Sequence, residues 1–180
     1  RNLFINALLS GIDRRKQILR EEGFQPPQFV VISPTMRCNL KCPGCYAGEY
    51  EQEEGLPAAL IDRILTECKE LGMYFNTMSG GEVLMRKDIF DIWEKHSDMY
   101  FQIYTNGTTI NEKVADRLAE LGNVAPMVSL EGFEEETDAR RGTGTYAKVM
   151  RAFDLMRERG MVYGASVTET RHNVEKIGRY

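Results

Sequence analysis

The sequence lacks the features that define several large protein classes. Its 180 residues contain no apolar run as long as the roughly 18 residues that a membrane-spanning helix needs, so we expect no transmembrane segment. Basic residues are outnumbered, 23 Lys and Arg against 27 Asp and Glu, and the net charge of −4 gives no reason to expect a nucleic-acid partner. With 42% hydrophobic and 28% charged residues, the chain has the composition of one globular domain.

A secretory signal is also missing. Residues 3–9 are apolar, but Arg14, Arg15 and Lys16 follow this stretch, whereas an export signal carries its positive charge in front. We therefore expect a cytoplasmic protein in a reducing compartment, where closely spaced cysteines bind metal or do chemistry more often than they form disulfides. Because the chain begins at Arg1 and stops at Tyr180 just as a new helical pattern starts, we expect both ends to be cut.

The first 27 residues are expected to form a segment of their own. Apolar residues recur at helical spacing over residues 1–24, and the prolines of residues 25–28 then form a rigid connector. We divide the chain into an N-terminal helical segment with its proline linker, residues 1–27, and a main domain, residues 28–180. The amphipathic helix is expected to pack on the main domain rather than to anchor it to a membrane.

The main domain alternates between short β-branched or aromatic runs and amphipathic helices. Strands are predicted at residues 29–33, 73–78, 100–105, 124–130 and 161–167, and helices at 57–71, 88–95, 112–121, 146–159 and, as a beginning only, 172–177. This alternation, without a Gly-rich dinucleotide loop after the first strand, predicts an α/β fold whose parallel sheet forms part of a TIM-like (β/α) barrel. A complete barrel needs about 250 residues, so only a partial barrel fits.

Three of the four cysteines lie close together. Cys38, Cys42 and Cys45 have the spacing C-x3-C-x2-C, and their thiolates are soft ligands for iron–sulfur clusters and zinc. Three ligands leave one metal position open, which is how a metal centre binds a substrate. Cys68 lies on the apolar side of a predicted helix and is expected to be buried, and the two histidines are expected to be surface or capping residues.

Polar and Gly-rich segments follow all five predicted strands. They are residues 38–46, 79–82, 105–108, 129–132 and 168–170. Because the C-terminal ends of all strands of a parallel barrel open on one face, we expect these loops to form a single site at the rim.

This combination resembles the radical S-adenosylmethionine (radical SAM) superfamily. The resemblance rests on the cysteine motif, on Gly80-Gly81-Glu82 and on Thr105-Asn106-Gly107, and it extends over residues 28–177. It implies the partial barrel of that family, with Cys38, Cys42 and Cys45 as ligands of a 4Fe–4S cluster and S-adenosylmethionine on the fourth iron. It further implies reductive cleavage of S-adenosylmethionine to a 5′-deoxyadenosyl radical, which abstracts hydrogen from a peptide or small metabolite. A reductant protein such as a ferredoxin or flavodoxin would supply the electron; the subfamily stays undetermined.

The resemblance also implies contacts to the methionine end of S-adenosylmethionine. Glu82 and the neighbouring carbonyls would accept hydrogen bonds from its ammonium group, and Gly80 and Gly81 would let the backbone approach it. Thr105 and Asn106 would contribute from the third loop.

Further contacts are implied by the later loops. Ser129 and Glu131 would bind the ribose hydroxyls, and Arg141 would pair with the methionine carboxylate, with Arg140 as the alternative.

The sequence departs from the family pattern before the third cysteine. The family often carries an aromatic residue there, near the adenine, whereas this chain has Gly44. Either the backbone of Gly44 makes that contact or Tyr46 supplies the ring. Two other functions also stay open: a zinc- or cluster-binding structural or interaction module without catalysis, and an enzyme remnant without a substrate pocket.

Overall fold

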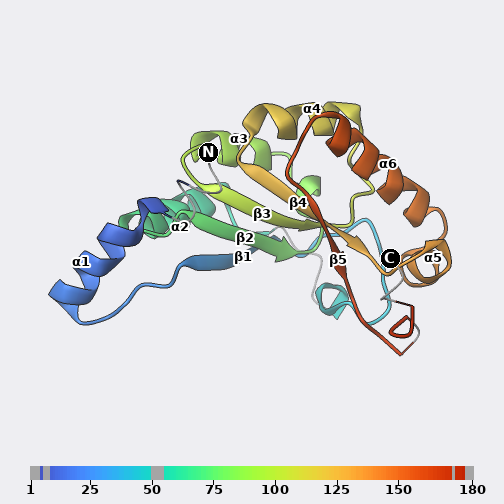
Figure 1. Ribbon diagram of the computed structural model, residues 1–180, viewed down its shortest axis with the longest axis horizontal. Coiled ribbons are helices and arrows are strands. Elements are labelled where there is room, and N and C mark those ends of the chain that lie inside the picture. Colours follow the sequence, from blue (N-terminus) through green and yellow to red (C-terminus); the bar gives the residue numbers. More distant parts are fainter. Residues whose placement is uncertain (1–4, 6–8, 50–54, 172, 177–180) are drawn as a thin grey trace.

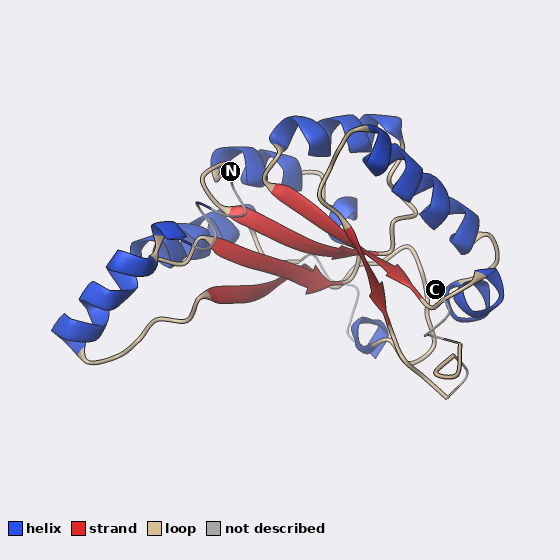
Figure 2. Ribbon diagram, in the orientation of Figure 1, coloured by secondary structure: helices blue, strands red, loops and turns tan. Residues whose placement is uncertain are grey.

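The computed structural model describes residues 5, 9–49, 55–171 and 173–176. Its parallel sheet consists of the five strands β1 (Phe29–Thr35), β2 (Phe75–Gly80), β3 (Tyr100–Thr105), β4 (Val124–Leu130) and β5 (Gly164–Val167), paired in sequence order. The helices are α1 (Ile12–Glu22), α2 (Ala58–Glu70), α3 (Ile89–Lys95), α4 (Glu112–Leu121), α5 (Glu134–Arg141) and α6 (Thr145–Glu158), with short 3-10 turns η2 (Tyr46–Glu49) and η3 (Val83–Met85). The predicted α/β partial barrel is confirmed (Figures 1 and 2).

The main core lies between the sheet and the helices that cover one of its faces, α2, α3, α4 and α6 (Figure 1). Ile32, Met78 and Ile103 are paired across β1, β2 and β3, and all three are buried. Trp93 of α3 is fully buried against them, and its indole N–H donates to Met78 Sδ at 3.4 Å. Burial of these large side chains is the main force that holds the helices on the sheet.

The opposite face of the sheet has a different character. Phe29, Phe75 and Tyr100 lie side by side on β1, β2 and β3, with ring centroids 5.9 Å and 5.7 Å apart. Side chains alternate between the two faces of a strand, so these rings point away from the helices. Phe29 is half exposed, whereas Tyr100 is buried.

The observed elements differ from the predicted ones mainly at their ends. Strand β2 begins at Phe75 because the N–H of Met73 donates to Cys68 O and still belongs to the end of α2. Strand β5 begins at Gly164, where pairing with Met127 starts. Residues 173–176 form turns rather than the predicted helix, whose other residues lie outside the described part of the chain. Residues 134–141 form helix α5, which is not among the predicted helices.

Helix α1 extends away from the sheet and is attached at its beginning (Figure 1). Arg14 Nε donates to Glu70 O at 2.9 Å, and Arg15 Nη1 donates to Gly72 O. The backbones are so close that a Cβ on Gly11 would lie 1.7 Å from Gly72 O. No helix in the described ranges is long and apolar enough to cross a membrane. The predicted domain boundary after residue 27 stays a prediction.

Candidate functional site

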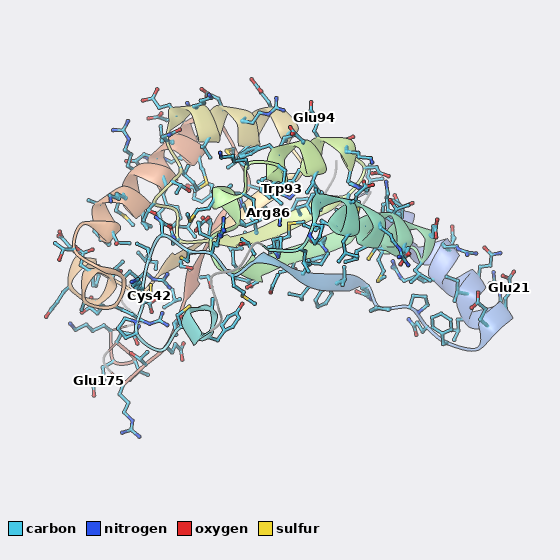
Figure 3. All side chains as sticks on the ribbon, turned by 180° about the vertical axis from the view of Figure 1, so that it is seen from behind. Glu21, Cys42, Arg86, Trp93, Glu94 and Glu175 are labelled. Carbon is cyan, nitrogen blue, oxygen red and sulfur yellow. The ribbon has the colours of Figure 1, made fainter. Side chains whose placement is uncertain are left out.

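The cysteine-containing loop begins at the end of β1, and hydrogen bonds join the residues before and after it. Pro34 O, before the loop, accepts hydrogen bonds from Leu56 N at 3.0 Å and from Arg86 Nη1 at 2.7 Å. Arg86 Nη1 also donates to Leu56 O at 2.7 Å, and its guanidinium binds both oxygens of Asp88 at 2.6 Å and 3.0 Å. We call these four residues the loop neck. In Figure 3 Arg86 lies near the middle of the molecule and Cys42 near one end.

The Gly80-Gly81 pair joins the end of β2 to the start of the same loop. Gly81 N donates to Thr35 O at 2.8 Å, and Glu82 N donates to Arg37 O at 2.7 Å. A Cβ on Gly81 would lie 2.1 Å from Arg37 O, and Gly80 has a φ of 105°. These glycines are therefore needed where two protein backbones meet, which adds a structural requirement to the expected approach of a ligand.

The carboxylate of Glu82 is fully buried and already satisfied by protein donors. Oε1 accepts from Thr105 Oγ1 at 2.7 Å and from Leu84 N at 3.1 Å, and Oε2 accepts from Asn106 N at 2.7 Å. Burial raises the pKa of Glu82, while these hydrogen bonds oppose the rise. Oε2 accepts only one of these hydrogen bonds, so the expected contact between this carboxylate and an ammonium group stays a prediction. Glu82 joins the ends of β2 and β3.

Asn106 faces the cysteine loop from the end of β3. Its Nδ2 donates to Asn39 Oδ1 at 2.8 Å and lies 3.7 Å from Cys38 Sγ. Its Oδ1 accepts from both the backbone N and Oγ1 of Thr108, at 2.9 Å and 2.7 Å. Asn39 Nδ2 donates in turn to Thr108 Oγ1 at 2.9 Å, which closes a ring of side-chain hydrogen bonds. We call Asn39, Asn106 and Thr108 the asparagine ring.

The three clustered cysteines form no disulfide in the described part of the chain and are half-buried, whereas Cys68 is buried as expected. The pKa of Cys42 is raised by its burial and by the negative charges of Cys45 and Cys38, and is lowered by the nearby arginines of α5. The three thiols therefore lie within electrostatic reach of one another. Among the described residues, no three Cys, His, Asp or Glu side chains could hold a single metal ion. Each cysteine of a 4Fe–4S cluster binds a different iron, so three thiols on one loop can supply three of its ligands.

A cavity of about 410 Å³ lies beside this loop, at the ends of β4 and β5. Residues that line it include Pro43, Glu131, Glu136, Arg140, Thr170 and Asn173. Two carboxylate oxygens of its lining, the Oε2 atoms of Glu131 and Glu136, are buried and have no hydrogen-bond partner among the described residues. Such oxygens are suitable acceptors for hydroxyl or ammonium donors of a ligand. Glu136 is therefore a cavity residue that the sequence did not indicate, and Lys176 binds its other oxygen.

Both candidate arginines are already bound to Glu131. Glu131 Oε1 accepts from Arg140 Nη1 at 2.5 Å and from Arg141 Nη2 and Nε at 2.5 Å and 2.8 Å. The side chain of Arg141 is only 10% exposed. Its expected pairing with a ligand carboxylate would require it to leave Glu131 or to share its remaining donors. Arg140 gives Glu131 one donor and its Nε lies 3.4 Å from Pro43 O, whereas Arg141 gives Glu131 two donors.

Tyr46 and Gly44 have different surroundings. The hydroxyl of Tyr46 accepts from Gly80 N at 3.1 Å and is 3.2 Å from Ser79 Oγ, so its ring is attached to the end of β2. Gly44 has a φ of 69°, and a Cβ there would meet nothing within 4 Å. Pro43 lines the cavity, and Gly44 is its direct neighbour in the sequence, whereas Tyr46 is three residues away. Ser129 is half-buried at the end of β4, paired with Ser166.

Asn173 was not predicted as a site residue. Its Nδ2 donates to Glu131 O and Thr168 O, both at 2.9 Å, and its Oδ1 accepts from Thr170 N at 2.6 Å. The side chain thus attaches the loop after β5 to the end of β4. A single asparagine in a segment with a helical pattern carries no sequence signal for such a role.

Comparison with known proteins links this geometry to one family. A sequence model of the radical SAM superfamily matches residues 32–171. The chain is 36% identical to an Fe-coproporphyrin III synthase of Methanosarcina barkeri, over 96% of this chain and 45% of that protein. It is 31% identical to the mycofactocin maturase MftC of Mycobacterium ulcerans, over 87% of this chain and 44% of the relative. The chain therefore spans less than half the length of these relatives.

Solved structures show the same fold. Native anSMEcpe with bound AdoMet superposes with a TM-score of 0.73 at 21% identity, covering 83% of this chain and 46% of that protein. Streptococcus suis SuiB bound to S-adenosylmethionine gives a TM-score of 0.75 at 21% identity, covering 93% and 41%.

Proposed function

The chain belongs to the radical SAM superfamily, and from this premise we propose that it is the core of an enzyme whose Cys38, Cys42 and Cys45 hold a 4Fe–4S cluster. Members of the family bind this cluster together with S-adenosylmethionine, and when bound the two supply a 5′-deoxyadenosyl radical that abstracts hydrogen from a substrate. The observation that carries the proposal is the arrangement of three cysteines on one loop whose start is bonded to Gly81 and Glu82 and whose ends are joined at the loop neck.

The residues of the chain hold and orient the bound groups. The loop neck and the Gly81 backbone contacts fix the path of the loop, so the three thiols are presented from a rigid frame. Burial raises the pKa of the Cys42 thiol, and the charges of the nearby Arg141 and Arg140 partly offset this rise. The free Oε2 of Glu131 can accept from a ligand hydroxyl, in agreement with the ribose contact expected for this residue. We also propose contacts to S-adenosylmethionine from Ser129, Thr105 and Tyr46.

The substrate belongs to one of two chemical classes. Relatives include a synthase named for a porphyrin and a solved structure of SuiB with its precursor peptide SuiA. We propose a peptide or a small metabolite, reached through the rim where the strand-end loops meet. A cytoplasmic ferredoxin or flavodoxin is the proposed source of the electron, since the reaction needs one-electron reduction of the cluster.

Anaerobic reconstitution with iron and sulfide, followed by reduction with S-adenosylmethionine present, tests the proposal. We expect about one 4Fe–4S cluster per chain and formation of 5′-deoxyadenosine, because the thiolates provide the three cysteine ligands of such a cluster. Cys42→Ala should abolish both, whereas Cys68→Ala, the matched control in the helix core, should keep both. Zinc binding without iron, or an unchanged Cys42→Ala variant, would contradict the proposal.

A further inference from the structure

The sulfur of Cys38 differs from the other two in its hydrogen bonding. Leu40 N lies 3.4 Å from Cys38 Sγ, and Asn106 Nδ2 lies 3.7 Å from it, both within the range of N–H···S hydrogen bonds. In the ranges that the structure describes, no such donor approaches the sulfur of Cys42 or Cys45. Leu40 donates from the loop itself, whereas Asn106 donates from the segment after β3, which is distant in the sequence.

The orientation of the Asn106 carboxamide is fixed by its neighbours. Both donors of Thr108 bind its Oδ1, so its amide nitrogen must point to the cysteine loop. The two hydrogens of that nitrogen suffice for Asn39 Oδ1 and Cys38 Sγ together. The backbone N of Asn106 is also bound by the buried carboxylate of Glu82, and the residue is only 6% exposed. The donor is therefore held in place rather than free to rotate toward water.

We propose that Asn106 is a positioning residue that raises the reduction potential of the cluster through its hydrogen bond to Cys38 Sγ. This inference rests on the proposed function, because it requires a cluster on the three cysteines. Reduction adds one electron to the cluster and increases the negative charge on its thiolate ligands. A donor at the sulfur stabilises that charge more in the reduced state than in the oxidised state, and hydrogen bonds to sulfur are known to set cluster potentials.

Redox titration of the cluster-loaded chain without S-adenosylmethionine, followed by electron paramagnetic resonance, tests the inference. Asn106→Ala should lower the equilibrium constant for reduction by about threefold to tenfold, and a tenfold loss corresponds to about 59 mV for one electron. Asn106→Asp should lower it further, because a carboxylate would replace the donor with negative charge. The matched control is Asn111→Ala, which removes the cap of α4 from Val114 N and should leave the potential unchanged.

A second measurement separates an electrostatic role from a merely structural one. Electron–nuclear double resonance of the reduced wild-type chain in H2O and in D2O should reveal an exchangeable proton coupled to the cluster, which Asn106→Ala should remove. Equal potentials for the wild type and Asn106→Ala would overturn the inference while leaving the proposed function intact. If Asn106→Ala loads no cluster, Asn106→Ser replaces it, because a serine side chain is too short to donate to Cys38 Sγ, and an unchanged potential and proton coupling would then overturn the inference. A wild-type chain that loads no cluster would contradict the proposed function itself, and the inference with it.

Discussion

At the scale of single residues, the site depends on polar groups whose partners come from distant strands. Glu82 follows β2, yet its oxygens bind the hydroxyl of Thr105 and the N–H of Asn106 at the end of β3. The sequence could predict that these residues lie near one another, because all follow parallel strands. It could not predict that they bind each other, because that depends on the direction of each side chain after folding.

Glu82→Gln should lower the free energy of unfolding of the metal-free chain by about 1–3 kcal/mol. An amide retains one acceptor oxygen, so its NH2 group must face a donor that now has no partner. Chemical denaturation measures the effect, with Glu120→Gln on the exposed surface of α4 as control. Equal stability of the wild type and Glu82→Gln would show that the three hydrogen bonds of Glu82 contribute little.

At the scale of elements, the strands and the helices of the main domain could be predicted from periodicity, and their ends less well. The predicted strands at 100–105 and 124–130 and the helix at 112–121 agree with β3, β4 and α4. The loop neck could not be predicted, because Arg86 lies in a segment without periodicity and binds the carbonyls of two residues far from it. The loop neck contributes to stability through tertiary contacts alone.

Arg86→Met should lower the free energy of unfolding by about 2–4 kcal/mol and make residues 36–49 more sensitive to trypsin. The substitution leaves the carbonyls of Pro34 and Leu56 without this donor and Asp88 without its partner. Arg63→Met is the control, since Arg63 forms an exposed pair with Glu67 and should contribute little. Unchanged proteolysis of Arg86→Met would contradict a role of the neck in holding the loop.

The ion pair between Arg86 and Asp88 in the loop neck predicts a dependence of stability on pH. Hydrogen bonds from Arg86 hold the pKa of Asp88 below its usual range. A carboxyl with a lowered folded-state pKa stabilises the fold above its unfolded pKa, about 3.9, and loses this effect as pH falls through the folded value. The difference in unfolding free energy between the wild type and Asp88→Asn should thus stay constant from about pH 6 to 8 and shrink below about pH 4. A difference that grows on acidification would contradict the assignment.

At the scale of the whole molecule, α1 is attached to the barrel through a close backbone contact between Gly11 and Gly72. Gly11→Ala would place a methyl group on Gly72 O, and we expect a loss of about 1–3 kcal/mol together with faster hydrogen exchange over Ile12–Glu22. Gly48→Ala is the matched control, because a Cβ there meets nothing within 4 Å. Unchanged exchange in α1 would show that the helix tolerates a wider separation.

The double attachment of the cysteine loop has a consequence for the maturation of the protein. The backbone contacts of Gly81 and Glu82 fix the start of the loop, and Arg86 fixes both its ends, all through bonds that involve no metal. In small zinc domains, by contrast, the free energy of metal binding is needed for folding. Here the loop is held by hydrogen bonds between protein groups, so we expect loss of the cluster to oxygen to leave a folded chain that can be loaded again.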